Sequence, residues 1–203
     1  MRYTLQVQYI GKNYAGSQIQ FENGKEIETP TIQGELEKAL CKLIIGKTEN
    51  NNRQIKTTFS GRTDRGVNSE GQIVHFDTDK SIVASKFIYS LNEILPDDIS
   101  VTDLKQVDEK FHAQKSAKKR YYRYVFINRK CKNAFDGDLM RIKYDINIER
   151  MQKALNYLLG EHDFSSFKSS GTLNPSKVCF IEKADCNKVG DKVIIDIIGH
   201  LSL

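Results

Sequence analysis

Phe59-Ser60-Gly61-Arg62-Thr63-Asp64-Arg65-Gly66-Val67 is a charged loop with a glycine near each end. It runs toward the apolar segment Gln72-Ile73-Val74-His75-Phe76. We predict strands at residues 55–60 and 72–78, joined by this loop. These two strands form the centre of a pattern that continues outward in both directions along the chain.

One step outward, each strand is flanked by a predicted helix. On the N-terminal side, apolar residues recur at helical spacing after Pro30 and Thr31, which give a helix start signal. The apolar residues are Ile32, Leu36, Leu40, Leu43 and Ile44. On the C-terminal side, residues 84–94 are predicted to form a helix that ends at Leu95-Pro96-Asp97-Asp98.

A second step outward reaches one more strand on each side. Residues 2–9 alternate between polar and apolar side chains, which is typical of a half-buried strand. Residues 99–107 are predicted to form the other strand. The resulting order, β-α-β-β-α-β, is the split βαβ plan of ferredoxin-like domains.

The second half of the chain begins with the same pattern. Its predicted elements are a strand at 119–128, a helix at 148–159, and strands at 178–186 and 192–198. In the first of these strands, Tyr122, Tyr124 and Phe126 share one face, and we expect Tyr124 and Phe126 to pack in a core. The prediction is therefore an α+β fold of two ferredoxin-like domains with antiparallel sheets, at residues 1–108 and 109–203. The second domain lacks its last helix and strand.

Composition limits the class of protein. The chain has 203 residues, of which 39% are hydrophobic, so it can form one large or two small cores. No apolar run approaches the roughly 20 residues that span a membrane. The cysteines form no CxxC pair, which predicts reduced thiols and a cytoplasmic protein, and the histidines lack metal-ligand spacing. These residues are Cys41, Cys131, Cys179 and Cys186, and His75, His112, His162 and His200. We predict no metal site.

The positive charge is concentrated in one segment. The formal net charge is +5, and between Lys110 and Lys132 nine basic residues occur without an acidic one. They are Lys110, Lys115, Lys118, Lys119, Arg120, Arg123, Arg129, Lys130 and Lys132. Such a cluster, with aromatic residues inside it, indicates a surface that binds RNA phosphates. The alternative is a solvated lysine-rich edge.

Within the central loop, Arg62 and Asp64 are two residues apart. In an extended segment, side chains with this spacing lie on the same side. A guanidinium beside a carboxylate keeps the carboxylate charged and oriented, as a catalytic nucleophile or base requires. The alternative is a surface turn that carries an ordinary ion pair.

The motifs of the chain resemble a known family. Ser60-Gly61-Arg62-Thr63-Asp64-x-Gly66-Val67, followed by Gly71-Gln72-x-Val74-His75-Phe76, is similar to the signature of TruA-type tRNA pseudouridine synthases. Further matches follow in the family's order and cover most of the chain. They are Tyr9-x-Gly11-x-x-Tyr14-x-Gly16-x-Gln18, Ile32-Gln33-x-x-Leu36-Glu37, Asn92-x-x-Leu95-Pro96-x-Asp98-Ile99, Phe111-His112-Ala113, Arg120-x-Tyr122-Arg123-Tyr124 and Gly160-x-His162-Asp163-Phe164-x-Ser166-Phe167.

The resemblance implies a set of catalytic residues. Asp64 would be the carboxylate that acts in the isomerisation of uridine to pseudouridine, either by attacking the ribose or by removing a sugar proton. Arg62 would pair with Asp64 and hold the flipped nucleotide, with a purely structural ion pair as the alternative. Tyr122 would stack on the target base, with core packing as the alternative. The isomerisation involves no redox change, so no cofactor is implied.

The resemblance also implies RNA contacts and partners. The residues expected to contact phosphates are Arg65, Lys118, Lys119, Arg120 and Arg123. The family's architecture implies an RNA-binding cleft between the two domains. The expected substrate is the anticodon arm of tRNA, bound by a homodimer.

The chain departs from the family pattern at several positions. Ser17 stands where many members carry an aromatic residue, Gln114 replaces a usual arginine, and Asn68 replaces a usual histidine. Family members also continue beyond the last residue of this sequence with a segment that helps to wall the active site. We therefore expect this sequence to be truncated at its C-terminus.

Two functions from different classes remain open at this point. The first is a tRNA pseudouridine synthase. The second is a non-catalytic RNA-binding module, or an inactive fragment, with the same fold. The intact Arg62-Thr63-Asp64 favours the enzyme, because RNA binding alone places no demand on a carboxylate.

Overall fold

A computed structural model describes residues 1–46, 55–167 and 178–200. The chain divides into two compact units, Met1–Ser116 and Ala117–Leu203, and each is described here by itself. Both units combine helices with largely antiparallel sheets, so the predicted α+β class is confirmed.

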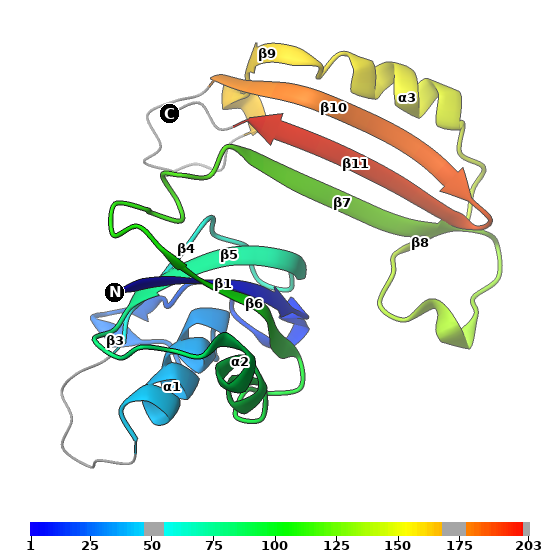
Figure 1. Ribbon diagram of the computed structural model, residues 1–203. Helices are drawn as coiled ribbons and strands as arrows, with labels where there is room; N and C mark the ends of the chain where they lie inside the picture. Colours follow the sequence, from blue (N-terminus) through cyan, green and yellow to red (C-terminus); the bar gives the residue numbers. More distant parts are fainter. Residues whose placement is uncertain (47–54, 168–177, 201–203) are drawn as a thin grey trace. The chain divides into compact units, whose positions relative to one another are not determined.

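The first unit is built on a four-stranded antiparallel sheet with two helices on one of its faces (Figure 1). The strands, in spatial order, are β4 (Thr57–Phe59), β5 (Ser69–Asp77), β1 (Arg2–Tyr9) and β6 (Ile99–Val107). The helices are α1 (Ile32–Ile44) and α2 (Ala84–Asn92). A short hairpin of β2 (Phe21–Glu22) and β3 (Lys25–Glu26) and a 3₁₀ turn, η1 (Gly11–Asn13), lie between β1 and α1.

The hydrophobic pattern of the sequence accounts for this packing. Along β1 the alternate residues Tyr3, Leu5, Val7 and Tyr9 are buried against the helices. The apolar stripe of α1 faces the same core, and the helix begins where the Thr31 hydroxyl accepts the Gly34 N–H at 3.1 Å. The predicted strand and helix are therefore confirmed here.

The end of α2 is fastened to β6 by one side chain. Asn92 donates to the Val101 carbonyl at 2.9 Å, and its Oδ1 accepts the Val101 N–H at 2.8 Å. This double contact fixes the chain where it turns from the helix through Leu95 and Pro96 into the strand. The turn at residues 95–99 is thereby held in one position.

The first unit ends later than the predicted boundary after residue 108. Arg2 donates to the carbonyls of Glu109 (2.8 Å) and Phe111 (2.6 Å), and the buried ring of His75 accepts the Ala113 N–H at its Nδ1 (3.1 Å). These contacts to β1 and β5 hold residues 109–116 on the first unit. The sequence pattern did not indicate them, because the partners are more than thirty residues apart along the chain.

The second unit contains a five-stranded sheet and one helix among its described residues. In spatial order the strands are β8 (Arg141–Ile142), β7 (Lys119–Asn128), β11 (Lys192–His200), β10 (Val178–Val189) and β9 (Gly160–Asp163). All pairs are antiparallel except β7 with β8. Helix α3 (Ile148–Asn156) packs against β10, and 3₁₀ turns η2 (Ala134–Asp136) and η3 (Ser165–Phe167) lie in the connections.

The core of the second unit is small, and this corrects one prediction. Met151 and Leu155 of α3 pack over Phe126, Cys186 and Val193, so the predicted burial of Phe126 is confirmed. Tyr124 was expected to be buried with Phe126, but its side chain is 53% exposed. It lies two residues nearer the start of β7, outside the cluster of residues that α3 contacts.

Short elements and helix ends were predicted least well. The strands β8 and β9 and the hairpin of β2 and β3 were not predicted, because segments of two to four residues show no periodicity. Helix α3 ends at Asn156, before the predicted Leu158 and Leu159. The strands β6 and β7 have the predicted bounds.

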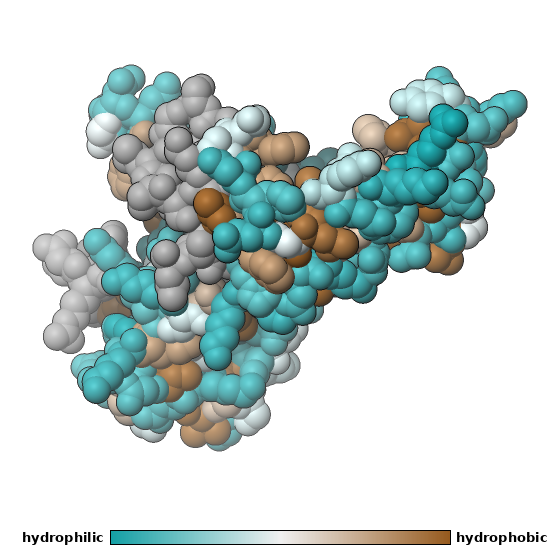
Figure 2. All heavy atoms as spheres, turned by 90° about the horizontal axis from the view of Figure 1, so that it is seen from above, coloured by the Kyte–Doolittle hydropathy of each residue, from teal (hydrophilic) through white to brown (hydrophobic). Residues whose placement is uncertain are grey.

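The face of the molecule seen in Figure 2 is mostly polar. In Figure 2, hydrophilic residues cover most of the face on view, and hydrophobic residues form separate patches between them. Among the residues that the structure describes, no helix is both long enough and apolar enough to cross a membrane.

The burial of His75 predicts a pH-dependent stability. Burial lowers the pKa of His75, and the charges of Arg2 and His112 act in the same direction. An unfolded histidine has a pKa of about 6.5, so below that pH the unfolded chain binds more protons than the folded chain. The contribution of neutral His75 to the free energy of unfolding is therefore fully present above about pH 6.5. It is lost as the pH falls from there toward the lower pKa of His75 in the folded chain.

Thermal unfolding followed by circular dichroism tests this. We expect the Tm of the wild type to fall more steeply between about pH 7 and about pH 5.5 than that of His75→Asn. The asparagine Oδ1 can accept the same Ala113 N–H but does not titrate. The substitution His162→Asn, at an exposed histidine, is the control. Equal slopes for the wild type and His75→Asn would contradict the assignment.

Candidate active-site loop

Residues 60–68, the loop between β4 and β5, present two charged side chains to solvent. Arg62 Nε lies 3.9 Å from Asp64 Oδ1, and the side chains of Arg62 and Asp64 are 56% and 88% exposed. An ion pair this long and this exposed contributes little to stability. The structure therefore brings Arg62 and Asp64 together, but their contact alone does not fix their direction.

The backbone after Asp64 forms a tight turn. The Val67 N–H donates to the Asp64 carbonyl at 3.2 Å, and Gly66 has a φ of +80°. That left-handed conformation favours glycine, since other side chains are strained in it. The turn leaves Asp64 and Arg65 exposed at the tip of the loop.

Residues 10–18, which follow β1, hold this loop from behind. The Ser17 N–H donates to the Thr63 carbonyl at 3.0 Å, and the Ser17 hydroxyl accepts the Thr63 N–H at 2.8 Å. The hydroxyls of Tyr9 and Thr63 lie 2.9 Å apart as hydrogen-bond partners. Thr63 is thus held inward by its backbone and its side chain, while its two neighbours point to solvent.

Two glycines allow the loops at 10–18 and 60–68 to approach this closely. A Cβ on Gly11 would lie 2.1 Å from the Val67 carbonyl oxygen, and a Cβ on Gly16 would lie 2.9 Å from the Thr63 carbonyl oxygen. Gly16 also has a φ of +133°. The Gly11 N–H donates to Asn68 Oδ1 at 2.9 Å. Glycine is therefore required at both positions of the Tyr9–Gln18 motif.

Residues 10–18 are themselves held by the turn at residues 95–99. The Ile10 N–H donates to the Asp98 carbonyl at 2.9 Å, and the hydroxyl of the buried Tyr14 donates to the Asp98 carboxylate. Burial raises the pKa of Tyr14, and the hydrogen bond to Asp98 raises it further. The Tyr14 hydroxyl therefore stays protonated and donates to the Asp98 carboxylate.

Helix α1 and strand β5 complete the support. The Gln33 N–H donates to the Ser17 carbonyl at 2.9 Å, and its Oε1 accepts the Ile19 N–H at 3.1 Å. Gln72 donates its side-chain amide to the Gly61 carbonyl. Four motifs of the first unit thus contribute to holding the loops at 10–18 and 60–68: Tyr9–Gln18, Ile32–Glu37, Gly71–Phe76 and Asn92–Ile99.

The basic residues predicted to contact RNA fall into two groups. Arg65 is exposed beside Asp64 in the first unit. In the second unit, Lys118 and Lys119 are exposed where the chain enters β7, and Arg120 is half-buried. Lys119 Nζ lies 2.5 Å from Glu182 Oε2, so part of its charge is already paired.

Arg123 has a protein partner that the local sequence did not indicate. Its guanidinium donates to both carboxylate oxygens of Asp196, at 2.8 and 3.0 Å, and to the Tyr121 hydroxyl at 2.6 Å. The hydrogen bonds from Arg123 hold the pKa of Asp196 below its usual range, and Asp196 raises that of Arg123. Asp196 is opposite Arg123 in the β7–β11 register, 73 residues away in sequence.

Tyr122 lies on β7 opposite Ile197 of β11, and its side chain is 54% exposed. The ring is therefore open to stacking, and the alternative of core packing does not hold for it within this unit. Tyr122 belongs to the second unit and Asp64 to the first, and each is placed only within its own unit.

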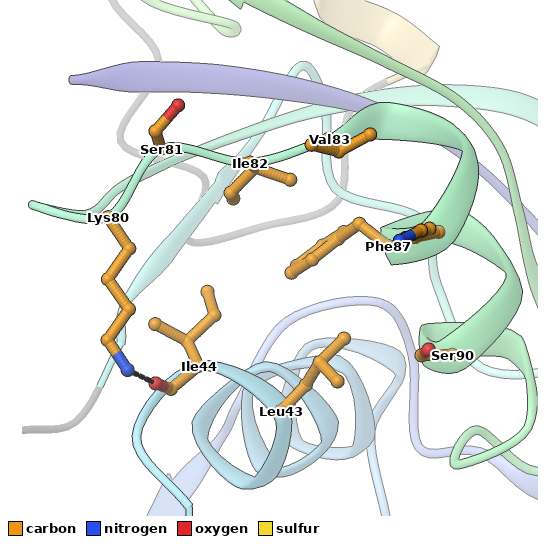
Figure 3. Close-up of a pocket in the computed structure, with 9 residues that line it drawn as sticks. Leu43, Ile44, Lys80, Ser81, Ile82, Val83, Phe87 and Ser90 are labelled. Carbon is orange, nitrogen blue, oxygen red and sulfur yellow. Dashed lines mark hydrogen bonds between the residues drawn. The ribbon is translucent and has the colours of Figure 1, made fainter.

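The structure also contains a cavity, which lies elsewhere in the first unit. A cavity of about 270 Å³ opens between the end of α1 and the start of α2, with Phe87, Ile44 and Ile82 turned toward it (Figure 3). Lys80 at its edge donates to the Ile44 carbonyl. None of its lining residues belongs to the loops at 10–18 or 60–68. The candidate site is thus an exposed loop and not this cavity.

Among the described residues, no three His, Cys, Asp or Glu side chains are grouped as metal ligands. The groups at the loop are a carboxylate, a neighbouring guanidinium and a braced backbone. Such a loop can place a carboxylate against a sugar or a phosphate-linked substrate from outside the fold.

Comparison with known proteins shows which families this chain resembles. Residues 51–172 match the model of a family described as "Uncharacterized protein conserved in bacteria (DUF2344)", a description that states no activity. The chain is also similar to curated proteins named tRNA pseudouridine synthase A. It is 35% identical to the one from Colwellia psychrerythraea, over 97% of this chain and 71% of the relative.

Two further relatives carry the same name. The chain is 38% identical to the protein from Bacillus licheniformis, over 98% of this chain and 76% of the relative. It is also 38% identical to the protein from Thermoanaerobacter sp. (strain X514), over 94% of this chain and 73% of the relative.

These similarities show that the chain is a member of the pseudouridine synthases, which are isomerases. Within that class, the chain belongs to the tRNA pseudouridine synthase A family. The family resemblance that the motifs predicted is thereby confirmed.

The contact between Tyr14 and Asp98 gives a testable prediction for the support of the loop. Tyr14→Phe removes the hydroxyl that donates to the carboxylate, and we expect the free energy of unfolding to fall by about 1–3 kcal/mol. Urea denaturation measures the change. Tyr89→Phe, at a tyrosine that is 69% exposed, is the matched control and should change little. Equal small effects would mean that the contact does not support the fold.

Proposed function

We propose that this chain isomerises uridine to pseudouridine in tRNA, with Asp64 as its catalytic carboxylate. The observation that carries the proposal is the bracing of Thr63. Its backbone N–H and carbonyl both bond Ser17, while the side chains of Arg62 and Asp64 on either side remain exposed. A loop whose inner residue is fixed and whose outer carboxylate is open suits a group that must reach a substrate in a defined direction.

The chemistry is an isomerisation without a change of oxidation state. The bond between uracil N1 and ribose C1′ breaks, the base rotates, and a bond forms between C5 and C1′. C5 loses its proton and N1 gains one, so the product is an isomer of the substrate. Asp64 either attacks C1′ or removes a sugar proton to begin this sequence. Arg62, whose Nε lies 3.9 Å from the Asp64 carboxylate, holds the extruded nucleotide. Tyr122, with its exposed ring, stacks on the target base.

The substrate proposed is the anticodon stem-loop of tRNA, bound through its phosphates. Arg65 supplies a cation beside Asp64, and Lys118, Lys119 and Arg120 supply further cations at the start of β7. Arg123 contributes less than was expected from the sequence, because its charge is paired with Asp196. We further propose a homodimer in the cytoplasm.

We also infer that both units are domains of the ferredoxin-like type. The β4-β5-β1-β6 order of the first sheet, with one helix before β4 and one before β6, supports this inference. In the second unit, β10, β11 and β7 have the equivalent order, and α3 precedes β10.

The competing proposal is a non-catalytic RNA-binding module with the same fold. An exposed aspartate beside Arg62 and Arg65 repels phosphates, so in a module that only binds RNA it would weaken binding. The bracing of the loop that carries Asp64 therefore favours the enzyme.

Replacing Asp64 by asparagine tests the catalytic role. Pseudouridine formation releases the C5 hydrogen of uridine, so tritium release from tRNA labelled at C5 measures turnover. We expect Asp64→Asn to reduce turnover by at least about 1,000-fold, because the reacting group is removed. Affinity for tRNA should stay within about threefold, because only one surface charge is removed.

The matched control is Asp97→Asn, which removes an exposed carboxylate from the same unit and should retain full turnover. Normal turnover of Asp64→Asn would exclude Asp64 as the catalytic group. Tight tRNA binding by a wild-type chain that releases no tritium would instead support the binding module.

The basic residues give a prediction for the salt dependence of binding. We expect the triple variant Lys118→Gln, Lys119→Gln, Arg120→Gln to bind tRNA more weakly. The slope of log Kd against log salt concentration should decrease by about one for each phosphate that the variant no longer neutralises. Filter binding over a range of salt concentrations measures the slope. The control variant Lys25→Gln, Lys42→Gln, Lys86→Gln removes the same charge from other exposed positions. Equal slopes for the two variants would place the RNA elsewhere.

A further inference from the structure

Ser17 is a buried polar residue that the proposed chemistry does not use. Its exposed fraction is 0%, although it lies in the loop at residues 10–18 and not in a helix or strand of the core. Buried hydroxyl groups need hydrogen-bond partners, so the partners of Ser17 indicate what it does.

The N–H and the hydroxyl of Ser17 both bond one residue, Thr63. The Ser17 hydroxyl accepts the Thr63 N–H at 2.8 Å and is 3.5 Å from the Thr63 carbonyl oxygen, which also accepts the Ser17 N–H at 3.0 Å. Both peptide groups of Thr63, one shared with Arg62 and one with Asp64, are therefore held by the same residue.

These two peptide groups determine the direction in which the Asp64 side chain leaves the loop. The side chain itself is 88% exposed, and its contact with Arg62 is 3.9 Å long. Rotation of the Thr63–Asp64 peptide would move the carboxylate. The ion pair with Arg62 is too weak to prevent that rotation. The direction of the carboxylate is thus set from behind, through Thr63.

Ser17 can act as a fixed point because it is anchored on the other side. Its carbonyl accepts the Gln33 N–H at 2.9 Å in the first turn of α1. The first turn of a helix has free N–H groups, and here one of them holds the residue that holds Thr63. The chain of contacts runs from α1 through Ser17 and Thr63 to Asp64.

We propose that Ser17 is a positioning residue for Asp64, acting through the Thr63 backbone. This rests on the proposed function. If Ser17 is replaced by alanine, the Thr63 N–H loses its acceptor, and the loop can relax toward other conformations. Displacement of a reacting group by about 1 Å can reduce turnover by about 100-fold.

Two variants separate the hydroxyl from the volume of the side chain. Ser17→Ala removes the acceptor, and Ser17→Cys keeps the approximate volume but accepts hydrogen bonds weakly. We expect both to lower kcat about 10- to 100-fold with KM for tRNA within about threefold, because the carboxylate is misplaced while the RNA-binding surface is intact.

Thr78→Ala is the control for a general loss of stability. Thr78 is also buried, and its hydroxyl accepts a backbone N–H, that of Lys80, at 3.2 Å. It follows the last residue of β5, at the opposite end of that strand from the 60–68 loop. Turnover is measured well below the unfolding transition of each variant. Thr78→Ala should then keep the wild-type kcat.

A readout that does not depend on turnover completes the test. Hydrogen exchange by mass spectrometry should show faster exchange in peptides covering residues 60–68 for Ser17→Ala, and unchanged exchange there for Thr78→Ala. A wild type without turnover would refute the proposed function, while this exchange comparison would still decide whether Ser17 fixes the loop.

Three kinetic results would overturn the inference. They are a wild-type kcat in Ser17→Ala, equal losses in Ser17→Ala and Thr78→Ala, and full activity in Ser17→Cys. Unchanged exchange at residues 60–68 in Ser17→Ala would overturn it as well. Slow turnover at nearly unchanged KM, together with faster exchange confined to that loop, would support it.

Discussion

The pairing of Thr63 with Ser17 is the constraint on which the candidate site depends. Two hydrogen bonds, of 2.8 and 3.0 Å, join the loop after β1 to the loop before β5, and each loop alone is an irregular segment. Irregular segments are usually the least rigid parts of a fold. Here Ser17 and Thr63 supply hydrogen-bond partners to each other, so each loop is held by the other. Gly11 and Gly16 are required because this pairing leaves no space for a Cβ.

Motifs far apart in the sequence serve one small region. The Asn92–Ile99 motif holds Asp98 under Tyr14, and the Ile32–Glu37 motif places Gln33 on Ser17. The exposed carboxylate is therefore held at the end of a series of contacts that begins in the core. A change in any buried member of the series has two expected effects, one on stability and one on turnover. The effect on turnover can be distinguished from the effect on stability only by comparison with a substitution at a buried residue outside this series.

Periodicity predicted the parts of the fold that depend on local burial. The alternation at residues 2–9 and the helical spacing from Ile32 to Ile44 report directly which face is covered. Periodicity did not predict which side chains meet when two strands that are distant in the sequence pair in the sheet. Asp196 pairs with Arg123 because β11 lies beside β7, and Tyr124 is exposed because the contacts of α3 end at Phe126. Ser17 was noted only as a departure from the family pattern, since nothing in its sequence neighbourhood indicates that it meets Thr63.

The contact between Asn92 and Val101 has a consequence for self-association. Strand β6 is at the edge of its sheet, and an edge strand with free N–H and C=O groups can pair with the edge of another molecule. The side chain of Asn92 occupies both groups of Val101, in the manner of a neighbouring strand. An incoming strand would have to displace it to continue the ladder. The amide that fixes the turn thus also protects this edge against aggregation.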